Sequence, residues 1–269
     1  MNPANDLLNH LLRLGDSALV QGQRLCEWCG RAPALEEELA LMNVGLDLVG
    51  QARNWLDYAA ELLADGRDAD HLAFRRDERA YRNLLLVEQP NGDFAVTMLK
   101  QFFYDAWHLE TLRGLCLSSD PRIAGVAAKA FKEVTYHLRR SSEWVERLGD
   151  GTEESHRRML QALPRLWRFT GELIATDPAE NALHQAGLLA DPAQVATAWQ
   201  DRVAAVFARA TLPVPEAPSH FYLDARKGLH TEHLGLLLAQ MQSLPRAYPD
   251  AVWCCLLYTS PSPRDVEES

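Results

Sequence analysis

The chain has 269 residues, 47% of them apolar, and a formal net charge of −10 from 27 basic and 37 acidic side chains. This acidic balance disfavours general binding to nucleic acid or to an anionic membrane surface. No apolar run is long enough to predict a membrane span, and the first residues lack the basic and then apolar layout of a secretion signal. We therefore expect a cytoplasmic protein with no nucleic-acid or membrane partner.

The first half of the chain predicts two long helices. The first covers about residues 5–29, and Gly30 and Pro33 end it. The second covers about residues 33–64 and has two apolar stripes. One of them follows steps of four and three, and the other follows a different face, which places this helix in the middle of a bundle. The first stripe contains Leu35, Leu39, Met42, Leu46, Val49, Leu56, Ala60 and Leu63, and the second contains Leu41, Leu48, Ala52, Trp55 and Leu62.

The rest of the chain is also helical in pattern, and strand patterns are absent. A charged bend over residues 65–93 contains a short helical stretch at about 77–87. Further helices are expected at about 93–117, 120–149, 153–175, 192–210 and 229–244, with a Pro-rich loop over 212–218. We therefore predict an all-α protein, a ferritin-like four-helix bundle core with additional C-terminal helices. Residues 1–253 are expected to form a single domain, and residues 254–269, which have no helical period, an unstructured or foreign tail.

Cys26 and Cys29 form a C-x-x-C pair at the end of the first predicted helix. Such a pair can be a redox motif or half of a zinc site. Redox pairs belong near βαβ patterns, and no second close pair completes four zinc ligands here. We therefore favour two reduced packing thiols.

Polar side chains inside the apolar stripes of the helices are candidates for a two-metal site. Carboxylate-bridged sites in such bundles take a carboxylate from each of two helices and a Glu-x-x-His from each of the other two. Asp105 lies in the stripe of the third long helix and His137 in that of the fourth. Glu27, near the end of the first helix, is the third candidate.

Several stretches closely resemble the C subunits of the bacterial ring-1,2-phenylacetyl-CoA epoxidases, which are multicomponent monooxygenases of phenylacetate breakdown. The resemblance runs from the first helix to about Trp253, and no counterpart is expected for residues 254–269. The matching stretches are Leu-Arg-Leu-Gly-Asp at 12–16, Gly-Leu-Asp-Leu-Val-Gly-Gln-Ala-Arg-Asn at 45–54, Leu-Leu-Leu-Val-Glu-Gln-Pro-Asn-Gly at 84–92, Tyr-His-Leu-Arg at 136–139 and Lys-Gly-Leu-His-Thr-Glu-His-Leu-Gly at 227–235.

The resemblance implies a related but non-catalytic partner of a di-iron catalytic A subunit. Where the catalytic protein has an Asp-Glu-Ala-Gly-His type motif, this chain has Leu48 and Gln51 at the Glu and His positions. Where it has Lys-Glu-Glu-Ser-Phe-His, Val134 replaces the Glu and His137 remains. Glu27, Asp105 and His137 would then be the surviving positions of a vestigial site. We expect no cofactor in this chain and a di-iron centre in the partner.

Three polar residues near these positions leave alternatives open. Arg53 interrupts the second helix's apolar stripe and either pairs with Glu27 or Asp105 or extends to the surface. Asp47 and Glu133 are possible substitute ligands of an active metal enzyme. Each is one residue away from the expected position, a rotation of about 100° around the helix, so both should point elsewhere.

Two charged segments are possible contacts for a partner or for the phosphates of a CoA ester, although solvated charge runs are common. The first is an arginine-rich bend containing Arg76, Asp77, Glu78 and Arg79, and the second contains Pro178, Ala179 and Glu180. His230 and His233 are spaced for a metal, but no third ligand is evident, and capping or interface roles are favoured.

From the resemblance we expect a structural, non-catalytic subunit of the phenylacetyl-CoA monooxygenase that forms a hetero-oligomer with the catalytic A subunit. A position of phenylacetyl-CoA near the interface stays open. The alternatives are an active di-metal enzyme using substitute ligands and a helical adaptor unrelated to oxygenases. The matching sequence motifs favour the structural subunit over both alternatives.

Overall fold

The computed structural model describes residues 3–216 and 223–251, and within this part of the chain all regular structure is helical. The long helices are α1 (Pro3–Cys26), α2 (Leu35–Leu63), α5 (Phe94–Leu115) and α6 (Pro121–Gly149). The others are α3 (Ala69–Phe74), η1 (Glu78–Ala80), α4 (Leu85–Glu88), α7 (Glu153–Trp167), α8 (Gly171–Ile174), α9 (Pro178–Gln185), α10 (Pro192–Arg209), η2 (Ala225–Lys227), α11 (Glu232–Met241) and α12 (Ser243–Ala247).

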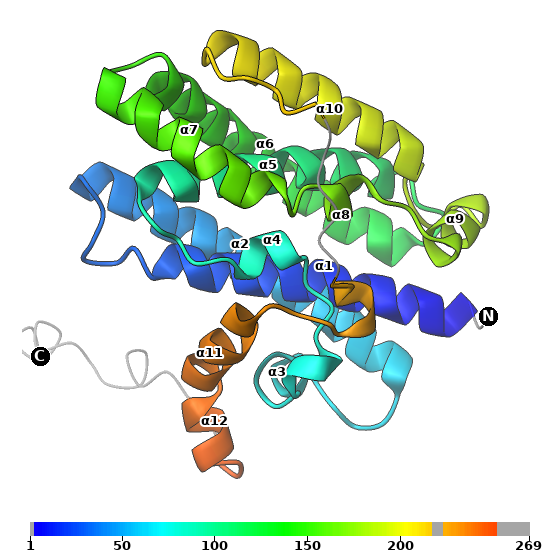
Figure 1. The fold of residues 1–269 in the computed structure, drawn as a ribbon. Helices are drawn as coiled ribbons and strands as arrows, with labels where there is room; N and C mark the ends of the chain where they lie inside the picture. Colours follow the sequence, from blue (N-terminus) through cyan, green and yellow to red (C-terminus); the bar gives the residue numbers. More distant parts are fainter. Residues whose placement is uncertain (1–2, 217–222, 252–269) are drawn as a thin grey trace, which may run out of the picture.

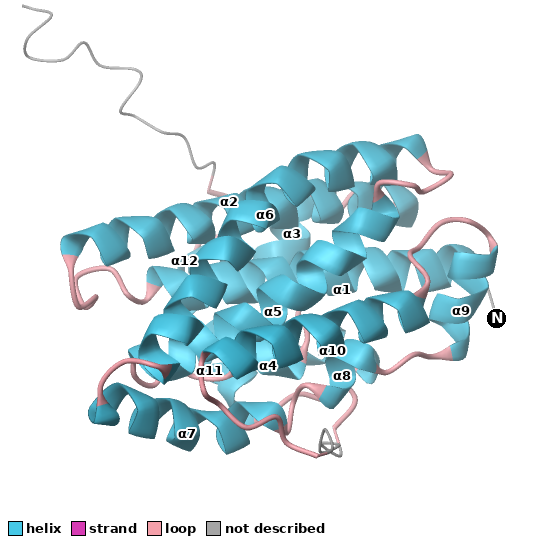
Figure 2. Cartoon of the chain, turned by 90° about the horizontal axis from the view of Figure 1, so that it is seen from above, coloured by secondary structure: helices cyan, strands magenta, loops and turns pink. Residues whose placement is uncertain are grey.

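The four long helices form two antiparallel pairs, α1 with α2 and α5 with α6, that pack on each other, as Figure 1 shows. The pair α1 and α2 approaches closely at Gly22 and Gly45, where a Cβ on Gly22 would lie 3.0 Å from the Gly45 carbonyl oxygen. Helices α7 and α10 cover the α5 and α6 pair. Figure 2 shows α2 along one edge of the molecule and α7 along the opposite edge. The predicted all-α, ferritin-like class is confirmed.

Aspartate caps explain where several helices begin. Asp93 accepts a hydrogen bond from the Val96 amide at the start of α5, and Asp120 accepts two at the start of α6 before Pro121. These caps satisfy amide groups that the first turn leaves unpaired. The same signal marks two helices that the periodicity missed, α3 after Asp68 and α9 after Asp177.

Some predicted boundaries were wrong for identifiable reasons. The helix expected over residues 153–175 is split into α7 and α8, and Pro164, which has no backbone N–H, lies in the last turn of α7. The helix expected from residue 229 begins only at Glu232, because Gly228 has a φ of 72° and ends the preceding turn. The stretch expected at 77–87 is two short pieces, η1 and α4.

The prediction that α2 lies in the middle of the bundle was also wrong. Leu41, Leu48 and Trp55 are fully buried, as the second stripe requires. On the first stripe, however, Leu35 is 67% exposed and Leu46 is 62% exposed. The reason is that α2 is an edge helix, with its neighbours on one side only.

Residues 252–269 lie outside the described part of the chain, so the division into a domain over 1–253 and a tail over 254–269 stays a prediction. No helix in the described ranges is long and apolar enough to cross a bilayer.

Candidate functional site

The three positions predicted as lost ligands all lie inside the four-helix core. Leu48 and Val134 are fully buried among apolar side chains. Gln51 is 2% exposed, and its amide nitrogen donates to Glu133 at 2.8 Å. Aliphatic side chains provide no electron pairs for a metal ion, so Leu48 and Val134 cannot be ligands. The amide nitrogen of Gln51 is bonded to α6, and its Oε1, which has no partner among the described residues, offers only one neutral oxygen. These residues therefore do not fit a two-metal centre.

Asp105, on α5, has a carboxyl group in the core, and this group is hydrogen-bonded to another side chain of the protein. It is fully buried and accepts a hydrogen bond from the Ser141 hydroxyl at 2.8 Å. Burial raises its pKa from 3.8 to about 6, a shift that the nearby His137 and the Ser141 hydrogen bond oppose. The carboxyl therefore titrates near neutral pH, and one of its oxygens, Oδ1, has no hydrogen-bond partner among the described residues.

His137 also lies in the core, but its hydrogen bond leads toward the surface of α2. Its Nε2 is 2.9 Å from a carboxylate oxygen of Asp47, whose side chain is 41% exposed. Asp47 and Glu133, the possible substitute ligands, were expected to point elsewhere, but each contacts a residue at a predicted ligand position, Asp47 at His137 and Glu133 at Gln51. That expectation is corrected, and each of the two contacts joins α2 to α6. His108, buried on α5 near His137, has its pKa lowered to about 3 by burial and stays neutral.

Glu27 does not belong to this layer of the core, which corrects its prediction as a surviving ligand position. It follows the end of α1 and accepts hydrogen bonds from Arg24 at 2.8 Å and from Asn91 at 3.1 Å. The adjacent Trp28 packs on Phe94, at the start of α5. Asp105 comes eleven residues after Phe94, about 16 Å further along the helix.

The polar side chain that α1 does place in this layer is Gln21. It is fully buried, neither of its amide atoms has a partner in the described part of the chain, and the next residue, Gly22, packs against Leu48. The sequence search missed Gln21 because it looked for charged ligands. Its signal was its place in the apolar series Leu14, Ala18, Gln21 and Leu25.

Within the described ranges, no group of three His, Cys, Asp or Glu side chains is arranged to hold a metal ion. Arg53 does not enter the core either. Its side chain is 78% exposed and lies 3.8 Å from Asp57, so its predicted pairing with Glu27 or Asp105 was wrong and the outward alternative is confirmed.

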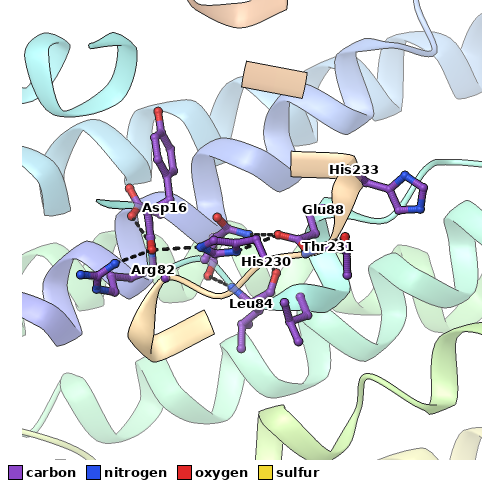
Figure 3. A network of polar contacts seen from close by, with 12 residues as sticks. Asp16, Arg82, Leu84, Glu88, His230, Thr231 and His233 are labelled. Atoms are coloured by element: carbon purple, nitrogen blue, oxygen red, sulfur yellow. Dashed lines mark hydrogen bonds and ion pairs between the residues drawn. The ribbon is translucent and has the colours of Figure 1, made fainter. Parts of the chain in front are cut away.

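A second buried polar region joins the segment around α4 to the segment before α11, as Figure 3 shows. Its centre is Glu88, which is fully buried. The carboxylate accepts hydrogen bonds from the backbone N–H and the hydroxyl of Thr231, both at 2.7 Å, and from Asn83 at 2.9 Å. His230 Nδ1 lies 3.0 Å from the same carboxylate, and His230 Nε2 lies 3.0 Å from the Tyr81 carbonyl oxygen. Every Glu88 carboxylate oxygen is thus occupied.

This network explains the two histidines that the sequence singled out. His230 is held inside the protein between Glu88 and Tyr81. Burial lowers its pKa, but the hydrogen bonds to Glu88 and Tyr81 and the negative charges of Glu88 and Glu172 together raise the pKa above its ordinary value. His233 lies apart from it with a 30% exposed side chain. The pair therefore does not converge on one point.

The arginine-rich bend is divided between the interior and the surface. Arg76 is 6% exposed and forms an ion pair with the fully buried Asp16, so its prediction as an outward contact is corrected. Asp77 has an 86% exposed side chain paired with Arg246. Glu78 and Arg79 lie in η1 beside the segment leading into α11. Contacts by Asp77, Glu78 and Arg79 with a partner or substrate stay a prediction.

The second charged segment lies at the start of α9. Pro178 and Ala179 are in the first turn, and Glu180 forms ion pairs with Arg13 at 3.6 Å and Arg226 at 3.1 Å. Glu180 and Ala179 line a cleft of about 210 Å³. Because Glu180 is held by two arginines inside the chain, its first role is to fix α9 on α1.

Cys26 and Cys29 are free thiols just where α1 ends. Burial raises the pKa of the Cys26 thiol, so the reactive thiolate is disfavoured there. Cys26 is half-buried, as a packing thiol requires, whereas Cys29 is exposed, so the prediction of two packing thiols is corrected for Cys29.

Comparison with known proteins gives two results. The sequence model of the phenylacetic acid catabolic protein family matches residues 2–253. A relative from Escherichia coli (strain K12), named as the C subunit of 1,2-phenylacetyl-CoA epoxidase, is 53% identical over 249 residues, which cover 93% of this chain and 100% of the relative. The chain therefore belongs to the phenylacetic acid catabolic protein family.

Proposed function

We propose that this chain is the structural, non-catalytic subunit of a multicomponent monooxygenase that epoxidises the ring of phenylacetyl-CoA. The name of the 53% identical relative supports the complex, because that protein is a subunit of 1,2-phenylacetyl-CoA epoxidase. In this proposal a separate catalytic subunit holds the two irons and performs the reaction in the cytoplasm. The present chain stabilises that partner in a hetero-oligomer.

One observation carries the non-catalytic part of the proposal. The ligand positions on α2 and α6 contain Leu48, Gln51 and Val134, and these side chains are packed into the core. The polar groups that remain are bound to other protein groups, Asp105 to Ser141 and His137 to Asp47. Binding iron would require breaking these contacts without supplying a complete ligand set.

Metal analysis of the purified chain tests this part. After incubation with ferrous iron and desalting, we expect no stoichiometric iron and no turnover of phenylacetyl-CoA with a reductase and O₂. About two irons per chain, the content of an intact carboxylate-bridged site, would contradict the proposal. It would favour the active enzyme with Asp47 and Glu133 as substitute ligands.

Co-expression with the catalytic subunit tests the structural part. We expect the two chains to elute together in size exclusion, and the catalytic subunit alone to be poorly soluble or inactive. Separate elution together with full activity of the catalytic subunit alone would contradict the scaffold role.

The proposal for substrate contact is limited to the residues that remain at the surface. Asp77 and Arg79 are exposed beside α11, and Arg suits the phosphates of a CoA ester. Reversing the charge of Arg79 should therefore weaken substrate binding or assembly by a few fold without changing the melting temperature. If the dissociation constants for substrate and for the partner subunit are unchanged, the segment is a solvated surface without a binding role.

A further inference from the structure

The turn that follows α1 holds Cys26 and Cys29 in a backbone geometry that suits a disulfide. The N–H of Trp28 donates to the Leu25 carbonyl oxygen at 3.1 Å, and the N–H of Cys29 donates to the Cys26 carbonyl oxygen at 3.1 Å. Successive bonds from one residue to the third before it form a 3₁₀-like turn, in which side chains three residues apart lie on the same side. The Cα atoms at the ends of such a turn are less than about 7 Å apart, a separation that a disulfide can span.

Contacts on both sides fix this turn in place. Trp28, between the two cysteines, packs on Phe94 with ring centroids 5.8 Å apart, and its indole N–H donates to the Thr97 hydroxyl at 3.1 Å. Gly30, whose φ is 74°, ends the turn, and its N–H donates to the Glu38 carboxylate at 2.9 Å. The backbone that carries the two thiols is therefore held by α2 and α5, which keeps the thiols near each other.

The two thiols differ in their access to solvent. Cys29 is exposed, whereas Cys26 is half-buried beside Gly45 of α2, where a Cβ would lie 3.0 Å from the Cys26 sulfur. Both cysteines line one surface cleft of about 530 Å³. Burial raises the pKa of the Cys26 thiol, and negative charge on Cys29 raises it further. An oxidant that enters the cleft therefore meets Cys29 first, and Cys26 lies behind it as a second thiol.

The charges around this cleft indicate which class of oxidant it admits. Arg31, which lines the cleft, is exposed and takes part in no ion pair among the described residues. Arg24, which also lines it, is instead bonded to Glu27 at 2.8 Å and to the Glu88 carbonyl oxygen at 2.7 Å. A small disulfide that carries carboxylate groups would pair with the guanidinium of Arg31 while one of its sulfur atoms meets Cys29.

We propose that Cys26 and Cys29 form a redox-active dithiol that exchanges reversibly with a small anionic disulfide. The Cys29 thiolate attacks one sulfur of the small disulfide, whose S–S bond breaks and releases one thiol. The Cys26 thiolate then attacks the Cys29 sulfur of this mixed disulfide, forms the Cys26–Cys29 bond and releases the second thiol. The protein loses two electrons and two protons, and the small disulfide gains them. This inference does not depend on the proposed function, because it involves neither a catalytic subunit nor a CoA ester.

Tryptic mapping of the full chain after incubation with mixtures of reduced and oxidised glutathione tests the proposal. The samples are quenched with acid, and their free thiols are alkylated. A single tryptic peptide, residues 25–31, contains both cysteines, so closure appears as a peptide that is lighter by two hydrogen atoms and is alkylated only after reduction. We expect the equilibrium constant for closure to be about 10-fold or more larger in the folded chain than in urea, because the turn holds the thiols together.

Variants at the two cysteines assign the order of attack. Cys26→Ser should stop the reaction at a stable glutathione adduct on Cys29, whereas Cys29→Ser should leave the half-buried Cys26 largely unreacted. Cys116, a free thiol that follows α5, is the internal control and should form no bond to either cysteine.

Arg31→Gln tests the class of the oxidant. The substitution should slow the reaction with glutathione disulfide several-fold, because the carboxylates of glutathione lose their partner. The reaction with hydroxyethyl disulfide, which is uncharged, should keep the rate of the parent.

Four results would overturn the inference. Alkylation of both cysteines in the most oxidising buffer would show that they are packing groups only. A glutathione adduct on Cys29 of the parent that never closes would show that Cys26 does not reach it. Equal closure in the folded chain and in urea would show that the folded turn contributes nothing. Equal slowing of both small disulfides by Arg31→Gln would contradict the anionic class.

Discussion

The two buried polar regions of this protein differ in how completely their groups are paired. Around Glu88, both carboxylate oxygens accept hydrogen bonds from Asn83 and Thr231, and His230 lies 3.0 Å away. In the layer between the long helices, Gln21 and His108 are fully buried, and both nitrogens of the His108 ring lack a partner among the described residues. The first region joins distant segments through paired groups, and the second also contains buried polar groups without a partner among the described residues.

The comparison shows why buried polar residues alone do not identify a working site. Unpaired polar groups in a core lower stability and are expected at sites shaped by function. The sequence predicts a former two-metal site in this core layer, and of the three predicted surviving ligands the layer contains Asp105 and His137. In the Glu88 region the sequence singled out His230 but not Glu88, and the hydrogen bonds of this carboxylate make the region a structural one.

The largest effect is expected for Glu88→Ala. Removing the carboxylate leaves the donors of Thr231 and Asn83 buried and unpaired, which should lower the free energy of unfolding by about 3–5 kcal/mol. Urea unfolding measures it, with Glu88→Gln as the control that keeps the side-chain volume. A loss under about 1 kcal/mol would mean that the network does not hold these segments together.

Arg76→Ala should lower the free energy of unfolding by a similar amount, because it leaves the fully buried Asp16 without its ion-pair partner. Arg79→Glu, three residues on and exposed, is the matched surface variant and should change stability by less than about 0.5 kcal/mol. Thermal unfolding of both variants compares the loss of a buried ion pair with a change at an exposed arginine. Equal melting temperatures would place Arg76 at the surface after all.

In the core layer between the long helices, replacing a buried polar group should raise the free energy of unfolding instead of lowering it. Asp105 has a pKa of about 6 in the folded chain and 3.8 as its ordinary value, so the folded state binds the proton more tightly. The ionised, buried carboxylate of Asp105 therefore lowers the free energy of unfolding. This loss is absent below about pH 4, grows between about pH 4 and pH 6, and is complete above about pH 6. Asp105→Asn removes the charge and should be more stable than the parent by about 1–3 kcal/mol at pH 7. Unfolding curves at pH 4 and pH 7 should show the gain only at the higher pH. A gain of equal size at both pH values would exclude titration of Asp105 as the cause.

Gln21→Leu should raise the free energy of unfolding by a smaller amount, about 1 kcal/mol. The substitution replaces an unpartnered buried amide with an apolar side chain of similar size. A chemical denaturation series is the measurement, and Gln51→Leu, which loses its hydrogen bond to Glu133, is the control that should not gain. A loss of stability for Gln21→Leu would show that this amide has a partner, such as an ordered water.

No effect is expected outside both regions, at the end of the chain. The family match stops at residue 253, and terminal segments without helical period contribute little to packing. Deleting residues 254–269 should leave the melting temperature and assembly unchanged. A decrease of several degrees in differential scanning calorimetry would assign that segment to the fold.

Much of this protein could be predicted from its sequence. Helical periodicity and aspartate caps such as Asp93 and Asp120 act within a few residues, so the four long helices could be placed without a structure. The family resemblance and the replacement of ligands by Leu48 and Val134 were also visible, because they depend only on residue type and spacing.

The tertiary structure decided which faces are covered and where each polar group finds its partner. The first apolar stripe of α2 has a pattern typical of a core, yet Leu46 is exposed because α2 lies at the edge of the bundle. Arg76 looks like a surface charge, yet it pairs with Asp16, sixty residues earlier in the sequence. Glu88 meets Thr231 across 143 residues. Local pattern determines a helix, but burial and charge pairing depend on contacts between distant segments, and only the folded chain brings those segments together.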